Sequence, residues 1–188
     1  MSEAITALLG ASFEGEVRVT DAGLRGMITL RGDLSDVKLA AAVKSAVGLA
    51  MPLARGIKEG SKGAVAWMSP DELLLLVDHD MADAVVAKLD KTLKENHFLA
   101  LNVSDARSMI DVHGAGCREV IAKGAPADLS VDALPIGEIR RTRLGQLAVA
   151  FWLSDAETMH VVCFRSVGAH VYAWLCNASQ KGTLPGFL

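Results

Sequence analysis

Apolar residues recur along the chain with two different spacings, one typical of β-strands and one typical of α-helices. In segments such as residues 26–30 (GMITL) and 108–112 (SMIDV), polar and apolar positions take turns, as in a strand with one buried face. In residues 81–93 and 167–178 the apolar residues return every three or four positions, which is typical of an amphipathic helix. The helical stripes consist of Val85, Val86, Leu89 and Leu93, and of Val171, Trp174, Leu175 and Ala178.

The same succession of patterns occurs twice. The segment GMITLRGDLSDVKLAAAV, which begins at Gly26, aligns with SMIDVHGAGCREVIAKGA, which begins at Ser108. Further along, AVAWMSPDELLLLVDHDMADAVVAKL from Ala64 aligns with AVAFWLSDAETMHVVCFRSVGAHVYAWL from Ala148. Both matches have an offset of about 82–85 residues, which indicates an internal duplication.

Each half therefore predicts a strand, a helix, a hairpin and a second helix. The hairpins turn at SPDE (residues 69–72) and SDAE (residues 154–157), which have the composition of type I turns. Strands joined by hairpins, with helices on one face, predict an α+β fold with antiparallel sheets rather than a doubly wound parallel sheet. We expect residues 1–105 to form the first half and residues 106–188 the second, with the two packed as one compact unit.

Three local features complete the predicted organisation. The first 25 residues stand outside the repeat, and AITALLGASF within them is apolar enough to be either an arm laid on a neighbour or a first helix of the core. Asp80 and Ser166 precede the two amphipathic helices and have side chains that commonly cap helix N-termini. Residues 126–143 predict a loop followed by a strand.

Length, charge and cysteine usage bound the class of protein. The 188 residues suit one ordinary domain or two small ones, and a net charge of -3 gives no reason to expect nucleic-acid binding. The start lacks the basic stretch of a signal peptide, and the longest strongly apolar run is far shorter than the roughly 20 residues that span a membrane. Cys117, Cys163 and Cys176 form no CxxC, which favours free thiols in a reducing compartment. We therefore expect a soluble cytoplasmic protein.

The apolar content is high for a chain of this length. Hydrophobic residues make up 51% of the chain, and with the 17 glycines the apolar share exceeds the roughly 45–50% of an ordinary domain. A small domain buries a smaller fraction of its surface than a large one does. Either the core is rich in alanine or part of the surface faces a partner, and both apply here.

Candidate chemistry is sparse. His113 and Cys117 are four residues apart across a turn with no third ligand nearby, so a turn histidine and a buried cysteine are favoured over a metal site. Residues 114–117 could bind phosphate at a helix start, but the dinucleotide fingerprint requires a glycine where Glu119 stands. No histidine base lies at helical spacing from the Cys117 thiol. No catalytic, cofactor-binding or metal-binding residue is predicted.

Four residues are instead predicted as interface candidates. Arg140, Arg141 and Arg143 form a basic cluster whose alternation places Arg140 on one strand face and the other two on the opposite face. The cluster suits either a grip on a carboxylate or phosphate, or a solvated strand or interface rim, and the second interpretation is favoured. Trp152 lies in a strand pattern and is more typical of a core or interface anchor than of a stacking platform.

Several short motifs occur together between about Gly26 and Ser179. Two of them are the segment AWMSPDELLLL at residues 66–76 and the closing helix FRSVGAHVYAWLCNAS at residues 164–179. The others are V-S-D-x-x-S at 103–108, R-E-V-x-x-K-G at 118–124, D-L at 128–129, P-x-G at 135–137 and R-T-x-L-G at 141–145. In this combination of motifs the chain resembles the gamma subunit of heterotetrameric sarcosine oxidase.

The resemblance implies a function at the level of a complex. Such oxidases convert sarcosine to glycine, reduce oxygen to hydrogen peroxide and transfer the one-carbon unit to tetrahydrofolate, so they are oxidoreductases that act on CH–NH donors. In the family, FAD, FMN, NAD and tetrahydrofolate are held by the larger subunits, and zinc by the delta subunit. The gamma chain itself is implied to be a non-catalytic structural partner of the alpha, beta and delta subunits. Self-association of the isolated chain is left open.

The family is in turn similar to the folate-binding domain of aminomethyltransferases, which implies the same two related α+β halves. The alternative function is therefore a stand-alone folate-binding protein of the aminomethyltransferase type. Those enzymes carry an acidic pair in a hairpin, whereas the matching place here reads Leu144-Gly145-Gln146-Leu147-Ala148. A glutamine side chain cannot release and recover a proton as a carboxylic acid does, which disfavours the alternative.

Overall fold

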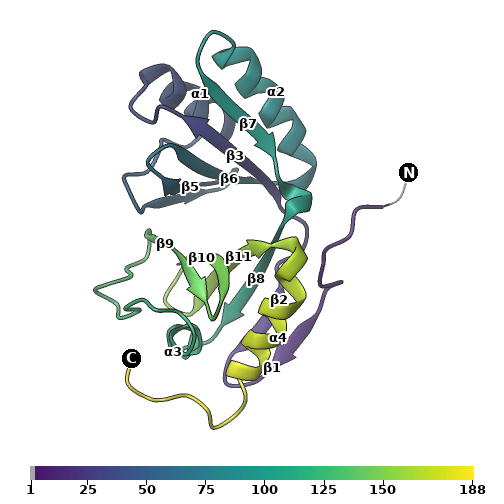
Figure 1. Cartoon of the computed structure of the whole chain (residues 1–188), viewed down its shortest axis with the longest axis vertical. Coiled ribbons are helices and arrows are strands. Elements are labelled where there is room, and N and C mark those ends of the chain that lie inside the picture. Colours follow the sequence, from purple (N-terminus) through teal and green to yellow (C-terminus); the bar gives the residue numbers. More distant parts are fainter. Residues whose placement is uncertain (1–2) are drawn as a thin grey trace. The chain divides into compact units, whose positions relative to one another are not determined.

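The computed structural model describes residues 3–188 and divides the chain into two compact units (Figure 1). One unit consists of Leu24–Asp105, and the other combines Ala106–Leu188 with the N-terminal segment up to Gly23. Each unit contains one antiparallel sheet and helices that pack on it. The predicted α+β class with antiparallel sheets is confirmed.

The first unit follows the predicted order and adds two strands. Its sheet has the order β4-β5-β6-β3-β7, and every neighbouring pair is antiparallel. The elements are β3 (Gly26–Gly32), α1 (Val37–Val47), β4 (Ile57–Gly60), β5 (Gly63–Ser69), β6 (Glu72–Val77), the 3₁₀ turn η1 (His79–Met81), α2 (Ala82–Leu93) and β7 (Phe98–Asn102).

Local chemistry explains the bounds of α1. The Asp36 side chain accepts a hydrogen bond from the Lys38 backbone N–H at 2.7 Å and so caps the first turn. Gly48 ends the helix at φ 78, a left-handed conformation that glycine adopts without steric cost. Helices α1 and α2 then bury their apolar faces against one face of the sheet, where Leu39, Val43 and Leu89 join strand residues in a single core.

The second unit repeats this arrangement. Its sheet has the order β1-β2-β8-β11-β10-β9 and is also antiparallel throughout. The elements are β1 (Ser12–Glu14), β2 (Arg18–Asp21), β8 (Arg107–His113), α3 (Cys117–Ala122), β9 (Ile139–Leu144), β10 (Leu147–Leu153), β11 (Thr158–Phe164), η3 (Arg165–Val167) and α4 (Gly168–Ala178). A short turn, η2 (Ser104–Ala106), precedes β8.

The two sheets correspond strand by strand. β3, β4, β5 and β6 of the first unit take the same places as β8, β9, β10 and β11 of the second. The strand beside β3 is β7, which follows the last helix of its unit, but the strand beside β8 is β2, which comes from the N-terminal segment. The duplication read from the sequence is therefore visible in the topology, with one strand supplied from a different part of the chain.

The N-terminal segment contains no first helix among residues 3–25, residues 1–2 lie outside the described residues, and an arm laid on a neighbour stays a prediction. Residues 4–11 form neither a helix nor a regular strand, and β2 pairs along β8 with Val19 opposite Val112. This pairing groups the segment up to Gly23 with residues 106–188, whereas the sequence placed residues 1–105 together. The cause is the open edge of β8, because backbone groups on a buried strand require a hydrogen-bonding partner. That the two halves pack as one compact unit stays a prediction.

The helix starts differ slightly from the predicted caps. Asp80 lies inside the 3₁₀ turn η1, and Ser166 lies inside the corresponding turn η3. Helix α2 begins at Ala82 and α4 at Gly168, each directly after its turn. Because a 3₁₀ turn closes its own backbone hydrogen bonds, these entries are made without a side-chain cap.

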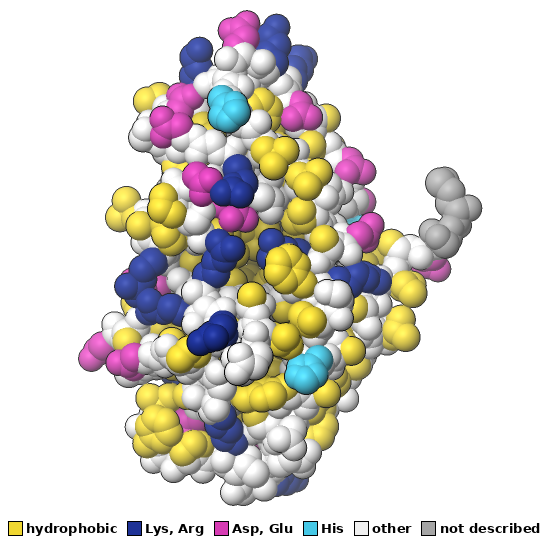
Figure 2. All heavy atoms as spheres, viewed as in Figure 1, with side chains coloured by type: hydrophobic (Ala, Val, Ile, Leu, Met, Phe, Trp, Pro, Cys, Tyr) yellow, Lys and Arg dark blue, Asp and Glu magenta, His cyan; other side chains and the backbone are white. Residues whose placement is uncertain are grey.

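Strands with both faces buried account for much of the apolar content. Every residue of β6 is buried, and so are five consecutive residues of β10. Figure 2 shows that apolar side chains reach the visible surface in several separate groups, with charged residues between them. Much of the apolar content is therefore used inside the chain, while the exposed apolar residues, such as Leu9, Val37 and Leu53, belong to separate segments.

The β2–β8 pairing leads to a stability prediction. Val19 is fully buried in the core of the second unit, so Val19→Ala removes two buried methyl groups and leaves a cavity. We expect a loss of about 2 kcal/mol in the free energy of unfolding of the full chain, measured by urea denaturation. Val131→Ala serves as the control, because Val131 is 68% exposed and its truncation is expected to change stability by less than about 0.5 kcal/mol. Equal effects of the two substitutions would contradict the packed β2 strand.

Candidate interface

The predicted reactive groups lie in unreactive surroundings. Cys117 is fully buried at the start of α3, and burial raises the pKa of its thiol, which disfavours the nucleophilic thiolate. Helix α3 has only six residues, and the side chain of Leu184 packs against Gly116 at its start. His113 lies within 3.4 Å of the Thr158 hydroxyl. Among residues 3–188, no group of three or more His, Cys, Asp or Glu side chains could hold a metal ion.

Two of the four interface candidates make contacts within the chain itself. Trp152 is fully buried on β10, where its ring lies against His160 with a centroid distance of 5.2 Å. Arg140 is partly buried and donates to the Ala133 carbonyl at 2.6 Å, with Glu138 at 3.8 Å. Trp152 is therefore not exposed to a partner, and Arg140 is directed at its own loop. The sequence could not show this, because the same alternation fits either face of β9.

The other two candidates, Arg141 and Arg143, are exposed on β9. β9 is the outermost strand of its sheet, and the two arginines stand opposite Ala150 and Ala148 of β10. The predicted alternation is thus present, with Arg140 on one face and Arg141 and Arg143 on the other. Whether these two arginines touch a partner stays a prediction.

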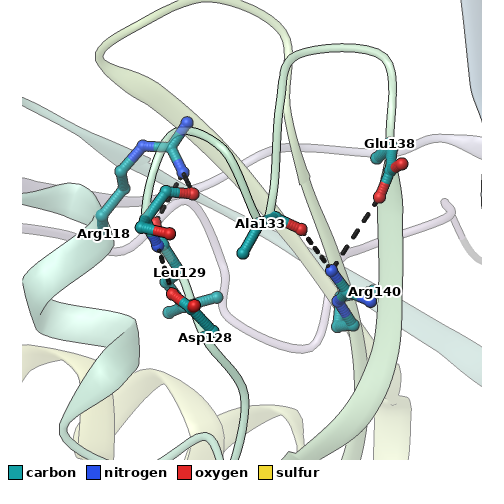
Figure 3. Close-up of polar contacts among 7 residues, drawn as sticks. Arg118, Asp128, Leu129, Ala133, Glu138 and Arg140 are labelled. Atoms are coloured by element: carbon teal, nitrogen blue, oxygen red, sulfur yellow. Dashed lines mark hydrogen bonds and ion pairs between the residues drawn. The ribbon is translucent and has the colours of Figure 1, made fainter.

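The loop that precedes β9 is held by arginines from both of its sides (Figure 3). We call residues 126–138 the pinned loop. From α3, Arg118 Nη1 donates to the carbonyls of Leu129 at 2.7 Å and Ser130 at 3.2 Å, and the Asp128 carboxylate accepts from the Ser130 N–H at 2.9 Å. From β9, Arg140 donates to Ala133. Hydrogen bonds from charged donors are among the stronger ones in proteins, so the loop has a defined shape.

The pinned loop also divides its apolar residues between the core and the surface. Leu129 and Leu134 are buried in the core of the second unit. Val131 and Ile136 are 68% and 57% exposed. A rigid loop that holds two apolar side chains in water, next to an exposed arginine strand, has the mixed character of a protein interface. The pinned loop and the exposed face of β9 together form the candidate interface.

One arrangement with catalytic appearance was not found from the sequence. Nδ1 of His160 lies 2.7 Å from an Asp111 carboxylate oxygen, and Nε2 lies 3.0 Å from the Ser154 hydroxyl. This is the order of contacts in a serine hydrolase triad. However, Asp111 stands directly opposite His160 on the neighbouring strand, and the Ser154 N–H donates to the Thr158 carbonyl within the hairpin. We interpret the group as a cross-strand hydrogen-bond network that joins β8, β11 and the end of β10. Alternation on β8 and β11 contains no signal for it, because it depends on the register between them.

Comparison with known proteins identifies the family. The model of the sarcosine oxidase, gamma subunit family matches residues 31–181. This chain belongs to the sarcosine oxidase gamma subunit family. The match includes the pinned loop and β9, but it begins after β1 and β2.

Relatives of the family show how far the similarity extends. The sarcosine oxidase subunit gamma of Corynebacterium sp. (strain U-96) is 29% identical over 143 residues, which cover 75% of this chain and 69% of the relative. The subunit gamma of Arthrobacter sp. is 24% identical over 160 residues, which cover 85% and 77% of the two chains. Both relatives have the name sarcosine oxidase subunit gamma.

Solved structures agree with the fold. A chain of the heterotetrameric sarcosine oxidase from Corynebacterium sp. U-96, solved in complex with pyrrole 2-carboxylate, has a TM-score of 0.79 at 26% identity, with 89% of this chain and 87% of that chain covered. The glycine cleavage system aminomethyltransferase T from Bartonella henselae has a TM-score of 0.63 at 13% identity, with 86% and 45% covered. The second similarity is one of fold alone.

No helix among residues 3–188 has the length and apolar character required to cross a membrane.

The pinned loop leads to a testable prediction. Arg118→Met removes the donor to two loop carbonyls but keeps much of the aliphatic stem. We expect a loss of about 1.5–3 kcal/mol in stability and faster amide exchange in residues 126–138, measured by urea denaturation and hydrogen exchange. Arg143→Met is the matched control and is expected to change neither quantity noticeably, because Arg143 is exposed. Unchanged loop exchange in Arg118→Met would show that the arginine does not hold the loop.

The buried thiols lead to a prediction about pH. Burial raises the pKa of Cys163 to about 11, from 9.0 for a free thiol. The folded state therefore keeps a proton that the unfolded state loses, so the contribution of this thiol to stability falls as the pH rises from about 9 to about 11. Cys163→Ala is expected to flatten this part of the stability curve, measured by thermal unfolding at a series of pH values. The same slope in the parent and the variant would contradict the burial of this thiol.

Proposed function

We propose that this chain is the gamma subunit of a heterotetrameric sarcosine oxidase and acts in that complex as a structural subunit without a reactive site of its own. The observation that carries the proposal is the family match over residues 31–181. The fold supports it, because the chain of the Corynebacterium oxidase is similar over most of both chains. The chain is thus a component of an oxidoreductase complex.

The proposed reaction belongs to the complex. Sarcosine is oxidised to glycine, oxygen is reduced to hydrogen peroxide, and the one-carbon unit passes to tetrahydrofolate. We assign FAD, FMN, NAD, tetrahydrofolate and zinc to the alpha, beta and delta subunits. The contribution of the gamma chain is then to hold its partners in place through the candidate interface. The three free cysteines support a reducing compartment, so we place the complex in the cytoplasm.

The non-catalytic role is supported by how the reactive side chains are used. The cysteine thiols at 117, 163 and 176 all have pKa values raised by burial. His160 is hydrogen-bonded on both ring nitrogens, to Asp111 of β8 and to Ser154 in the turn after β10. At the turn between β9 and β10, where aminomethyltransferases carry acidic residues, Gln146 supplies a carboxamide, which cannot act as a general acid or base.

The proposal is tested by purification of the tagged full chain from the cells in which its gene is native. We expect co-elution with flavin absorbance and with sarcosine-dependent production of hydrogen peroxide. In a parallel experiment the isolated chain is titrated with tetrahydrofolate in a calorimeter, and we expect no tight binding. Elution of the chain without flavin would contradict the proposed complex. Tight folate binding by the isolated chain would instead support the stand-alone aminomethyltransferase-like function.

A further inference from the structure

The outermost strand β7 of the first unit lacks the features that usually protect a sheet edge. An edge strand presents unpaired backbone groups, and proteins block such edges with charged side chains, proline or very short strands. β7 has five residues, FLALN, with no charge and no proline. The three other edge strands are protected in this way. β9 carries three arginines, β4 carries Lys58 and Glu59, and β1 has only three residues.

The register shows which backbone groups of β7 point away from the sheet. Ile28 of β3 stands opposite Asn102, and the Val103 N–H donates to the Met27 carbonyl at 2.8 Å. In an antiparallel pair, hydrogen-bonded residues alternate with residues whose N–H and C=O groups point outward. Leu99 and Leu101 therefore bond to β3, in step with Val103. The N–H and C=O groups of Phe98, Ala100 and Asn102 point outward, where a further strand would pair.

The side chains of β7 give the edge an apolar face and a helix-covered face. Phe98 and Ala100 pack against the core under α1 and α2. Leu99 and Leu101 point to the opposite face and are 51% and 52% exposed. Two leucines at alternate positions form an apolar row along the open edge, which a strand with its own apolar row would bury.

The helix-covered side of the same edge is acidic. Asp83 of α2 accepts a hydrogen bond from the Asn102 side chain at 2.7 Å, which places this side of the helix over β7. Asp90 lies two turns further along the same helix side and is exposed. Lys94 lies one turn beyond Asp90, past the last residue of α2. Asp83 and Asp90 are thus the charged residues that α2 itself contributes to this side, and both are acidic.

In the second unit, the position that corresponds to the outward edge of β7 is occupied by a strand. β2 takes the position beside β8 that β7 takes beside β3, and β1 then pairs with β2 on its outer side. In that pair Phe13 stands opposite Val19 and packs against the core. The first unit has no strand beyond β7 among residues 3–188.

We propose that the outward edge of β7 binds an extended segment of a partner subunit, in which apolar residues alternate with Lys or Arg. Alternate side chains of an added strand point to opposite faces. The apolar ones would lie beside Leu99 and Leu101, and the basic ones beside Asp83 and Asp90. This inference rests on the proposed function, because it takes the partner from the oxidase complex.

Charge disfavours a second copy of this chain as the occupant. If two β7 edges paired antiparallel, the two sheets would continue into each other and both α2 helices would lie on the same side. Asp83 and Asp90 of one copy would then face those of the other, and like charges across a strand pair are destabilising. A basic strand meets the same surface with complementary charge.

Residue-level hydrogen exchange tests the proposal. The isolated full chain is compared with the purified oxidase complex that contains it. We expect the amides of Phe98, Ala100 and Asn102 to exchange fast in the isolated chain and at least about 100-fold more slowly in the complex, because each gains a hydrogen-bond acceptor. The amides of Leu99 and Leu101 should be slow in both states and serve as internal controls.

Variants test the same edge through assembly. Ala100→Pro removes an outward N–H but no bond to β3, and is expected to lower the share of the chain that co-elutes with flavin at least about tenfold. Ala100→Ser keeps the N–H and is the matched control. Asp90→Asn should weaken assembly severalfold at low salt and reduce its salt dependence. If Ala100→Pro fails to fold, the exchange measurement on the parent protein still decides.

The outcomes separate this proposal from the function on which it rests. A flavin-containing complex in which the outward amides exchange as fast as in the isolated chain would overturn the β7 proposal and leave the function intact. If the outward amides of the isolated chain become protected as its concentration rises, the occupant is a second copy of this chain, and the β7 proposal is overturned. Normal assembly of Asp90→Asn at every salt concentration would overturn the basic character of the partner. A chain that elutes without flavin would overturn both proposals.

Discussion

Hydrogen bonding on both sides of the two central strands is the constraint on which the structure depends. β3 is paired by β6 and β7, and β8 is paired by β11 and β2. Both central strands are largely buried, so an unpaired backbone group on either would cost about as much as a lost hydrogen bond. In the first half the chain returns after α2 to supply β7. In the second half α4 is followed by the C-terminal tail, and the N-terminal segment supplies the strand instead. The pairing of Val19 with Val112 brings together residues that are far apart in the sequence. Contacts of this kind form slowly in folding.

The sequence predicted the elements whose signals are local. The stripes of Val85, Leu89 and Leu93, and of Val171 and Leu175, correspond to α2 and α4, and the turns at 69–72 and 154–157 join the expected hairpins. The duplication could be read because both halves keep the same order of strands and helices. The position of β2 could not be read, because strand pairing depends on backbone groups that look alike in every residue. The four residues of β2 are also too few for their alternation to indicate a strand.

The residue types of the candidate interface could be predicted from the sequence, but the directions of their side chains could not. Alternation correctly separated Arg140 from Arg141 and Arg143, but the inward face is decided by the pinned loop, whose carbonyl at Ala133 receives Arg140. Trp152 lies in a continuous apolar run, AVAFWL, which in a strand buried on both faces has no outward side. The Asp111–His160–Ser154 network shows the same limit. Three ordinary polar residues acquire a triad-like geometry only through the register of β8 against β11 and the position of the turn after β10.

The total apolar content of the chain does not by itself indicate a permanent partner. The placement of a few exposed apolar residues does. Two-sided burial in strands such as β6 and β10 absorbs most of the excess, so the average hydrophobicity of the chain does not require an apolar surface. What does require an explanation is the placement of four of the exposed apolar residues. Leu99 and Leu101 lie on an unprotected edge, and Val131 and Ile136 lie on a loop held rigid by two arginines. An open apolar edge invites pairing with any extended chain, which is a hazard for a protein that exists alone and no hazard for one whose edge is covered on assembly. The contrast between the open edge at β7 and the covered edge at β2 is thus the difference expected between the side of a subunit that binds a partner and the side that it completes with its own chain.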